Sequence, residues 1–203
     1  AVAASHDGRG KLPPLVVAWR ALRRLMPAGT LRAASGLPAV LAAGALVNAA
    51  FFGVDAYVPL SLTAVRGQSI ALGGLPLTSA TLGWTAGAWV QARLTTRVDR
   101  RILLESGLGG IGLGVVGAAV VLLSDVPTAL ATLAWGVAGL GMGLAYSTVS
   151  LAILQSVTDE QAGKASSSLQ LANVLGSAIG TGAGELALGL VSAGGGPVRV
   201  SLA

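Results

Sequence analysis

Long apolar blocks dominate the sequence and constrain its fold more than any other feature. Each is close to or above the roughly 20 residues that an α-helix needs to cross a bilayer. The blocks cover residues 37–62, 70–92, 102–123, 126–154 and 168–193. Only 10% of all residues are charged, whereas a soluble domain carries about 25% charge. The sequence therefore predicts an all-α fold, a polytopic transmembrane helical bundle of about five spans.

Short polar connections separate the apolar blocks. One of them is nearly absent, being only "SDVP", and the longest is "QSVTDEQAGKA". Because short connections place consecutive helices side by side, neighbouring spans are expected to lie antiparallel. The chain should thus divide into a cytoplasmic segment (1–36), a transmembrane bundle (37–193) and a short external tail (194–203).

The basic residues indicate how this bundle is oriented. Arg66 and Arg199 fall on one predicted side, and the other eleven of the thirteen Lys and Arg residues fall on the opposite side. These eleven are Arg9, Lys11, Arg20, Arg23, Arg24, Arg32, Arg93, Arg97, Arg100, Arg101 and Lys164. Positive residues are retained in the cytoplasm, so we expect a multi-pass protein of the cell (plasma) membrane with a cytoplasmic N-terminus.

The segment before the first block carries a second pattern. In "LVVAWRALRRLM", Leu15, Trp19, Leu22 and Met26 recur at helical spacing. This pattern favours a basic amphipathic helix lying along the inner leaflet. A short basic loop with chance periodicity is the alternative.

Glycine is abundant, with 30 residues in the chain. Small residues spaced four apart allow helix backbones to approach closely within a bilayer. The pattern occurs at Gly83 and Gly87, in "GIGLG" (110–114), in "GLGMG" (139–143) and in "GSAIGTGAG" (176–184). Helix packing is the simpler interpretation. The functional interpretation is that smooth glycine faces also let helices slide past one another in a protein that changes shape.

Composition argues against several classes of function. The pI of about 10.8 and the net charge of +5 would suit a nucleic-acid-binding protein, but the basic residues flank apolar blocks instead of forming one stripe, so no nucleic acid partner is expected. Cysteine is absent and the single histidine, His6, lies in the polar N-terminal segment. No metal site, cofactor, nucleophile–base pair or Walker A motif is expected, and the chain is predicted not to be an enzyme.

Asp55 is the most unusual residue of the apolar blocks. It lies past the midpoint of the first predicted span, in "FFGVDAYVPL", and Pro59 follows four residues later. A proline donates no N–H to the carbonyl four residues before it, so the helix should be weakened at Asp55 itself. A carboxylate within a membrane is costly and is a functional candidate by default. Reversible protonation is one interpretation, and a hydrogen-bonded packing residue near the outer interface is the other.

Two further acids lie in or beside the predicted spans. Glu185 should reach a depth similar to that of Asp55, because the first and fifth spans are expected to run in the same direction. It is therefore a second candidate for proton coupling. Glu105 follows Arg101 by four residues, and an ion pair along one helix explains it more simply.

Polar side chains inside the blocks could line a path for a substrate. The candidates are Asn48, Trp84, Tyr146, Ser150 and Asn173. Hydrogen bonds between helices are the default role of such residues in a membrane.

Four stretches, residues 27–62, 77–103, 136–157 and 165–185, resemble the C-terminal half of a major facilitator superfamily transporter, in particular the actinobacterial multidrug-efflux-like permeases. The most specific stretch is "GWTAGAWVQARLTTRVDRR". It is similar to the family's basic signature in the cytoplasmic loop between the second and third helices of a six-helix half. Gln91 stands where the family often has an acid, and Asp99 where a glycine is common.

The resemblance implies a mechanism as well as a fold. Gly87, Arg93, Arg97, Arg100 and Arg101 would form a loop that latches the cytoplasmic gate. The family has two halves around a central cavity that alternate in access. The expected partners are the lipid bilayer, a small-molecule substrate, and either a missing N-terminal half or further copies of the chain.

Two functions of different classes follow from the sequence. The first is a secondary active transporter, or part of one, that exports small lipophilic compounds in exchange for protons. The second is a non-transporting membrane scaffold, or a degenerate transporter remnant, that binds other membrane proteins through its glycine faces.

Overall fold

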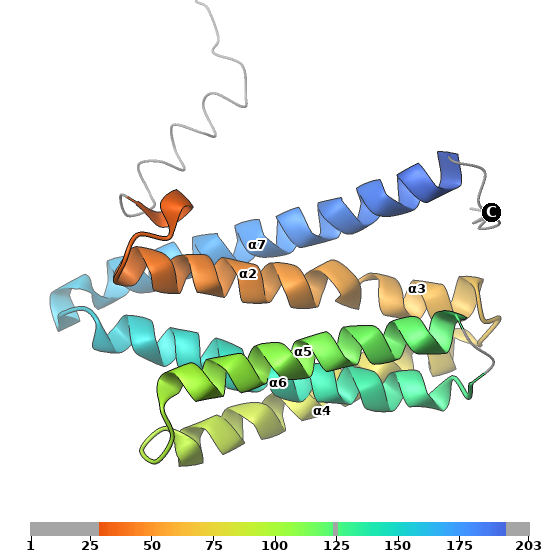
Figure 1. Cartoon of the computed structure of the whole chain (residues 1–203), viewed down its shortest axis with the longest axis horizontal. Helices are drawn as coiled ribbons and strands as arrows, with labels where there is room; N and C mark the ends of the chain where they lie inside the picture. The colour runs from red at the N-terminus through yellow and green to blue at the C-terminus, as the bar shows by residue number, and fades with distance from the viewer. Residues whose placement is uncertain (1–28, 124–125, 194–203) are drawn as a thin grey trace, which may run out of the picture.

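The computed structural model describes residues 29–123 and 126–193, and every regular element in these ranges is helical (Figure 1). The elements are η1 (Thr30–Arg32), α2 (Leu37–Asp55), α3 (Tyr57–Ala64), α4 (Ile70–Leu94), α5 (Arg100–Leu123), α6 (Ala129–Gln155) and α7 (Asp159–Ala193). The predicted amphipathic helix and the predicted external tail lie outside the described residues.

The helices form an elongated bundle whose sequential neighbours are antiparallel, as the short connections predict (Figure 1). Helices α2 and α3 follow one another as a single rod, interrupted at Ala56. The rod formed by α2 and α3 runs in the same direction as α5 and α7, and α4 and α6 run in the opposite direction. The all-α bundle is thus confirmed.

Three of these rods are long and apolar enough to cross a membrane, judged by length and composition: Leu37–Ala64, Arg100–Val121 and Ala129–Gln155. Helices α4 and α7 carry more polar residues, including four Ser and Thr residues between positions 78 and 85 of α4 and the charged first turns of α7. Their crossing of the membrane stays a prediction, supported by the way they run alongside the three apolar rods.

The last helix differs most from the sequence expectation. Helix α7 begins at Asp159, well before residue 168, so most of the expected connection between the last two blocks is helical. Asp159 and Glu160 occupy the first turn, where negative charge interacts favourably with the helix dipole. Because these residues are polar, hydropathy alone assigns them to a loop.

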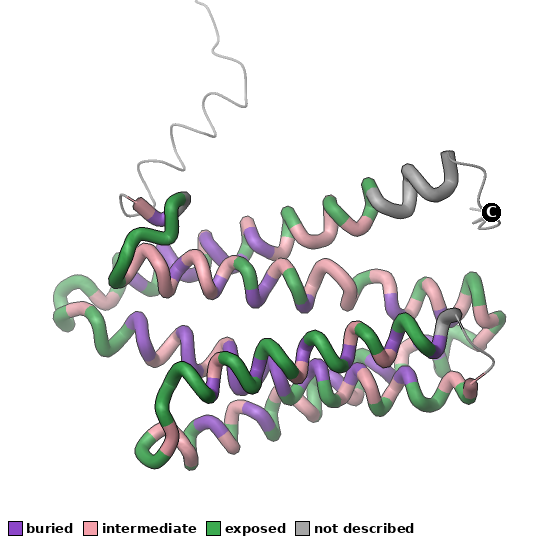
Figure 2. Tube along the Cα trace, viewed as in Figure 1, coloured by how far each residue is buried: buried purple, intermediate pink, exposed green. Residues whose placement is uncertain are grey.

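Helix α6 lies at the centre of the bundle. In its most apolar stretch 61% of the residues are buried, against 28% in the rod α2–α3 and 28% in α5. Figure 2 shows this concentration of buried residues, and Trp135 and Met142 of α6 are fully enclosed. Helices α4 and α5 both pack along α6, α7 packs along α2, and a smaller contact between α2 and α6 joins the two groups.

Glycines make these contacts close. The Cα of Gly87 on α4 lies against the backbone of Leu140 and Gly143 on α6. Gly107 and Gly114 of α5 approach α6 in the same way, and Gly176 and Gly180 of α7 lie against the carbonyls of α2. The sequence prediction that the glycine faces pack helices together is confirmed on three interfaces.

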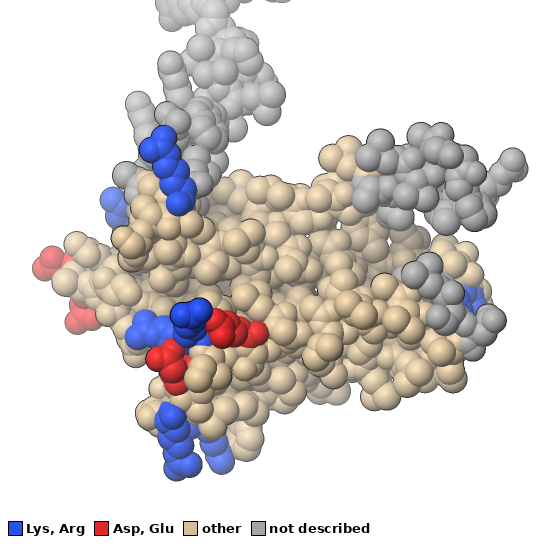
Figure 3. Space-filling model, viewed as in Figure 1, with Lys and Arg blue, Asp and Glu red and all other residues tan. Residues whose placement is uncertain are grey.

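The two ends of the bundle differ in charge, as Figure 3 shows. We call the end that carries Arg32, Arg93, Arg97, Arg100, Arg101 and Lys164 the basic end. At the opposite end Arg66 donates hydrogen bonds to the carbonyl oxygens of Val121 (2.7 Å) and Val126 (2.9 Å), at the end of α5 and in the segment that follows it.

The glycine contacts predict which substitutions the fold tolerates. A Cβ at Gly139 would lie 2.7 Å from the Cα of Ala80, so Gly139→Ala should lower the free energy of unfolding by about 1–3 kcal/mol through overpacking. Unfolding of the purified chain in bicelles measures this change.

Gly112→Ala is the matched control, because a Cβ at Gly112 meets nothing within 4 Å. This variant should be neutral or more stable by up to about 1 kcal/mol, since alanine is the better helix former. Equal effects of the two substitutions would contradict the α4–α6 contact.

Candidate functional site

The helix is interrupted beside Asp55, where the sequence predicts a weak point. Helix α2 ends at Asp55 and α3 begins at Tyr57. Pro59 lies in the first turn of α3 and cannot donate to the Asp55 carbonyl. The break is small, because Ala56 keeps a right-handed helical conformation with φ −63° and ψ −27°. Asp55 therefore lies at a joint between two helices of one rod.

The Asp55 side chain contacts α6. Its Oδ1 accepts a hydrogen bond of 2.7 Å from Nε1 of Trp135. Trp135 is fully buried and Asp55 is half-buried, so a carboxyl group and an indole donor meet inside the bundle. The second carboxylate oxygen accepts no hydrogen bond from any residue that the structure describes. The interhelical bond expected for a packing residue is present, and one oxygen remains available for a proton.

Aromatic rings connect Asp55 to the middle of the bundle. Trp135 stacks on Phe51 with ring centroids 5.3 Å apart. The Phe51 ring meets Trp84 of α4 at 5.9 Å, and Trp84 meets Tyr146 of α6 at 5.7 Å. We call Phe51, Trp84, Trp135 and Tyr146 the aromatic column; it joins α2, α4 and α6.

A polar cluster continues from the aromatic column. Asn48 of α2 donates to Oδ1 of Asn173 on α7 at 3.0 Å. Asn173 in turn donates to Tyr146 Oη at 3.1 Å and to Gln170 Oε1 at 3.3 Å. Asn48 and Asn173 are both buried. The structure therefore brings together four of the five predicted path residues, Asn48, Trp84, Tyr146 and Asn173.

Ser150, the fifth predicted path residue, stays apart from these contacts. It lies one turn beyond Tyr146 on α6 and is half-buried. Its hydroxyl makes no hydrogen bond with another residue in the described ranges. Phe51, by contrast, was not among the sequence candidates, although its position four residues before Asp55 places the two side chains on one helix face.

Glu185 reaches the level of Asp55 but lies in different surroundings. The neighbouring Gly184 packs beside the Tyr57 ring and the Gly53 carbonyl, which places this part of α7 next to the α2–α3 joint. The Glu185 side chain is exposed and forms no ion pair or hydrogen bond with a described residue.

Within the described part of the chain, no three His, Cys, Asp or Glu side chains lie close enough together to hold a metal ion.

The residues expected to form a gate loop are spread over two helices. Gly87 is buried within α4 against α6, and Arg93 is also helical, with its guanidinium carbon 4.0 Å from the centre of the exposed Trp89 ring. Only Arg97 lies in the connection, because α4 continues to Leu94 and α5 begins at Arg100. The expectation of one loop is therefore corrected: helix-favouring sequence extends from both sides.

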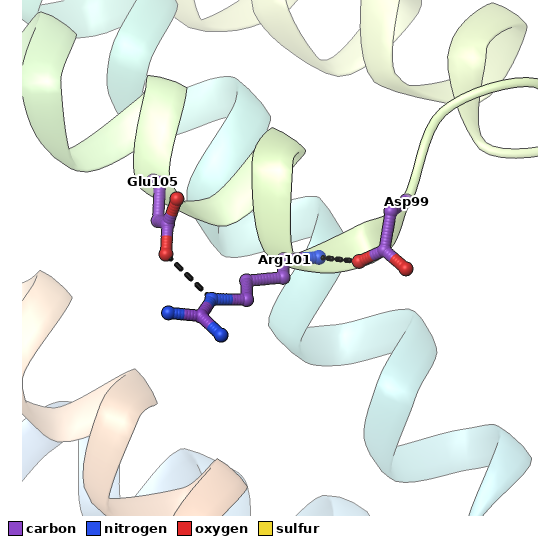
Figure 4. Close-up of polar contacts among 3 residues, drawn as sticks. All are labelled: Asp99, Arg101 and Glu105. Atoms are coloured by element: carbon purple, nitrogen blue, oxygen red, sulfur yellow. Dashed lines mark hydrogen bonds and ion pairs between the residues drawn. The ribbon is translucent and has the colours of Figure 1, made fainter.

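Arg101 and its neighbours stabilise the start of α5, as Figure 4 shows. The Arg101 Nε donates to Glu105 Oε1 at 2.7 Å, which confirms the ion pair predicted from their spacing. Asp99 Oδ1 accepts a hydrogen bond of 2.7 Å from the backbone N–H of Arg101. Asp99 thus caps the helix.

The polar cluster generates a test of its own geometry. Single replacements Asn48→Ala and Asn173→Ala, together with the double replacement, form a thermodynamic cycle. Because the two amides share a buried hydrogen bond, the cycle should give a coupling of roughly 0.6 kcal/mol and at most about 1.7 kcal/mol.

Unfolding in bicelles gives the four free energies that the cycle needs, those of the unchanged chain, the two single variants and the double variant. Ser150→Ala, one turn beyond the cluster on α6, replaces Asn173→Ala in a control cycle with Asn48→Ala and should show no coupling. Additive effects of Asn48→Ala and Asn173→Ala would contradict the bond.

Comparison with known proteins assigns the chain to a family. Its sequence matches the model of the Major Facilitator Superfamily over residues 3–181 of its 203. No curated protein and no solved structure matches it. The match agrees with an all-helical bundle that contains rods long and apolar enough to cross a membrane. The chain is therefore a multi-pass membrane protein that belongs to the major facilitator superfamily of transporters.

Proposed function

We propose that the chain is a secondary active transporter, or half of one, that exports small lipophilic compounds in exchange for protons. The observation that carries this proposal is the hydrogen bond between Asp55 and Trp135 at the end of the aromatic column. It places a carboxylate, which can take up a proton, at one end of the aromatic column, whose half-buried rings Trp84 and Tyr146 can bind an apolar compound.

The aromatic column suits lipophilic substrates. Faces and edges of aromatic rings bind planar apolar molecules over a large area with specific geometry. The polar cluster of Asn48, Tyr146 and Asn173 continues the column and offers amide and hydroxyl groups. Ligand sites commonly combine apolar walls with a few polar groups in this way. The five residues Asn48, Phe51, Trp84, Tyr146 and Asn173 are the proposed substrate contacts.

Asp55 is the proposed site of proton coupling. A hydrogen bond to an ionised carboxylate is roughly twice as strong as one between neutral groups. Protonation of Asp55 therefore weakens its bond to Trp135 and with it one link between α2 and α6. A substrate bound on the rings and a proton bound on Asp55 then both affect the bond between Asp55 and Trp135. Coupling of substrate binding to proton binding requires such a shared contact.

The joint at Ala56 supplies a position for movement. Helix α3 is attached to α7 through the bond from Tyr57 Oη to the Thr181 carbonyl, 2.7 Å long. Helix α2 and α7 also form one of the two packed groups of the bundle. Helix α3 also packs on α4. We infer that α2 and α7 move together against α4, α5 and α6, with the joint at Ala56 absorbing the movement relative to α3. The second half of a complete transporter, or another copy of the chain, closes the cavity.

The orientation and the membrane belong to the proposal too. With the basic end in the cytoplasm of a plasma membrane, Arg93, Arg97, Arg100 and Arg101 lie at the cytoplasmic gate. Gly87 contributes through the packing of α4 on α6. Glu185, exposed at the level of Asp55, is the second carboxylate available to protons.

A scaffold that binds partners through its glycine faces has less support. The faces around Gly83, Gly87, Gly139, Gly143, Gly176 and Gly180 already pack against helices of the same chain. They are therefore not available to a partner without unfolding the bundle.

Asp55→Asn tests the coupling. The amide still accepts a hydrogen bond from Trp135 but binds no proton in the working pH range, so proton-driven efflux should be abolished while membrane insertion is unchanged. Substrate movement into everted vesicles under an imposed pH gradient, measured with the complete protein, checks this. Normal efflux by Asp55→Asn would remove Asp55 from the mechanism, and Trp135→Phe should show an intermediate loss.

Two tryptophans on α4 offer a matched test of the substrate surface. Trp84 lies in the aromatic column, whereas Trp89 is 58% exposed on the outside of the bundle. Trp84→Leu should weaken binding of a planar lipophilic dye about tenfold, the equivalent of roughly 1.4 kcal/mol. Trp89→Leu should leave it unchanged. Titration of dye fluorescence in liposomes measures both, and equal affinities for the two variants would contradict the assignment.

A further inference from the structure

A second polar site lies at the basic end, away from Asp55. There α4, α5 and α6 enclose a cavity of about 510 Å³. Its walls include Gln91 of α4, Thr148 and Gln155 of α6, and Asp99 and Arg100 at the start of α5. The aromatic column and the polar cluster do not contribute to this cavity.

Gln91 is the residue that points to a ligand. Its side chain is only 5% exposed, and its Nε2 is buried without a hydrogen-bond partner in the described part of the chain. A buried donor that stays unpaired costs about 1–3 kcal/mol, so such groups in folded proteins are normally satisfied by a partner. Gln91 also lines the cavity, and a partner there that presents an acceptor oxygen to this amide would satisfy it.

The charges around the cavity favour an anionic acceptor. The Asp99 carboxylate caps α5, and Arg101 is paired with Glu105. Arg100 also lines the cavity and forms no ion pair with any residue in the described ranges. The positive end of the α5 dipole lies at the same place. Arg100, the Asp99-capped N-terminus of α5 and the residue with the unpaired amide donor therefore line one hollow.

Neighbouring residues place the cavity at the depth of lipid headgroups. Trp89 and Arg93, on either side of Gln91 in the sequence, form a cation–π pair on the exposed surface of α4. Exposed tryptophans gather where the hydrocarbon core of a bilayer meets the headgroups. Basic pockets between helices at the cytoplasmic side bind anionic headgroups.

We propose that the cavity at the basic end binds the phosphate group of an anionic phospholipid, with Gln91 donating a hydrogen bond to it and Arg100 supplying the positive charge. The bound lipid fills the space between α4, α5 and α6 and holds their ends together. This inference rests on the proposed orientation and shares Arg100 with the proposed cytoplasmic gate, but none of its residues touches the aromatic column or Asp55.

The test uses the whole chain in nanodiscs of phosphatidylcholine that contain increasing fractions of phosphatidylglycerol. Native mass spectrometry counts the phosphatidylglycerol molecules that remain bound after the protein is released. Gln91→Leu keeps the volume of the side chain and removes the donor, so the affinity for the retained lipid should fall roughly tenfold or more. Arg100→Gln, at an exposed position that does not endanger folding, should cause a loss of similar size.

Lys164→Gln is the matched control, since it removes one positive charge from the same end but outside the cavity. It should leave the retained lipid in place. Equal losses from Lys164→Gln and Arg100→Gln would indicate general surface attraction and overturn the proposal. So would unchanged retention by Gln91→Leu, because water alone would then satisfy the amide.

A further arm identifies the source of the phosphate group. Inorganic phosphate is added to nanodiscs of phosphatidylcholine alone and to nanodiscs that contain phosphatidylglycerol. The proposal expects that inorganic phosphate neither binds nor displaces the lipid. Displacement that depends on Gln91 would assign the site to a soluble oxyanion and overturn the lipid as its ligand.

Discussion

The close approach of helix backbones is the constraint on which the rest of this structure depends. Inside a bilayer the hydrophobic effect does not draw helices together, because lipid is as apolar as their side chains. Packing and hydrogen bonds must do so instead, and both require short distances. Glycines on α4, α5 and α7 allow their backbones to touch those of α6 and α2. Helix α6 thereby becomes the centre around which the other elements are arranged.

That close packing positions the polar groups. Asp55 reaches Trp135, and Asn48 reaches Asn173, because the intervening interfaces are thin enough for side chains of ordinary length to span them. Each pair satisfies groups that would be costly alone in an apolar environment. The Asp55–Trp135 bond and the bond from Asn173 to Tyr146 also join the α2–α7 group to the α4–α5–α6 group. These bonds act together with an apolar core that also spans both groups and contains Phe51 of α2 with Trp135 and Met142 of α6.

Much of this architecture could be predicted from the sequence. The apolar blocks indicated the helices and their antiparallel order, and the glycine spacing indicated the contact faces. Pro59 indicated the break after Asp55, and the spacing of Arg101 and Glu105 indicated their ion pair. These features are local, because each depends on residues within a few turns of one helix.

Other features depend on which helices become neighbours, which no local pattern specifies. The bond between Asp55 and Trp135 joins residues 80 apart in the sequence, and that between Asn48 and Asn173 joins residues 125 apart. Glu185 could be placed at the right depth, but not on an exposed face. The extension of α7 back to Asp159 was missed for a different reason: the turn is polar, and hydropathy detects only the apolar part of a helix. Gln91 likewise became informative only when its surroundings were known.

The capping of α5 by Arg66 affects how positive charge is distributed between the two ends of the bundle. Arg66 is the one basic residue that the described ranges contain at the end opposite the basic end, and its guanidinium is directed onto carbonyl oxygens at the end of a helix. The Val121 carbonyl lies in the last turn of α5, at the negative pole of the helix dipole, so part of this charge is compensated within the protein. At the basic end the acidic residues Asp99, Glu105, Asp159 and Glu160 offset part of the positive charge as well. Both ends of the bundle therefore present less free positive charge than their Lys and Arg residues alone suggest.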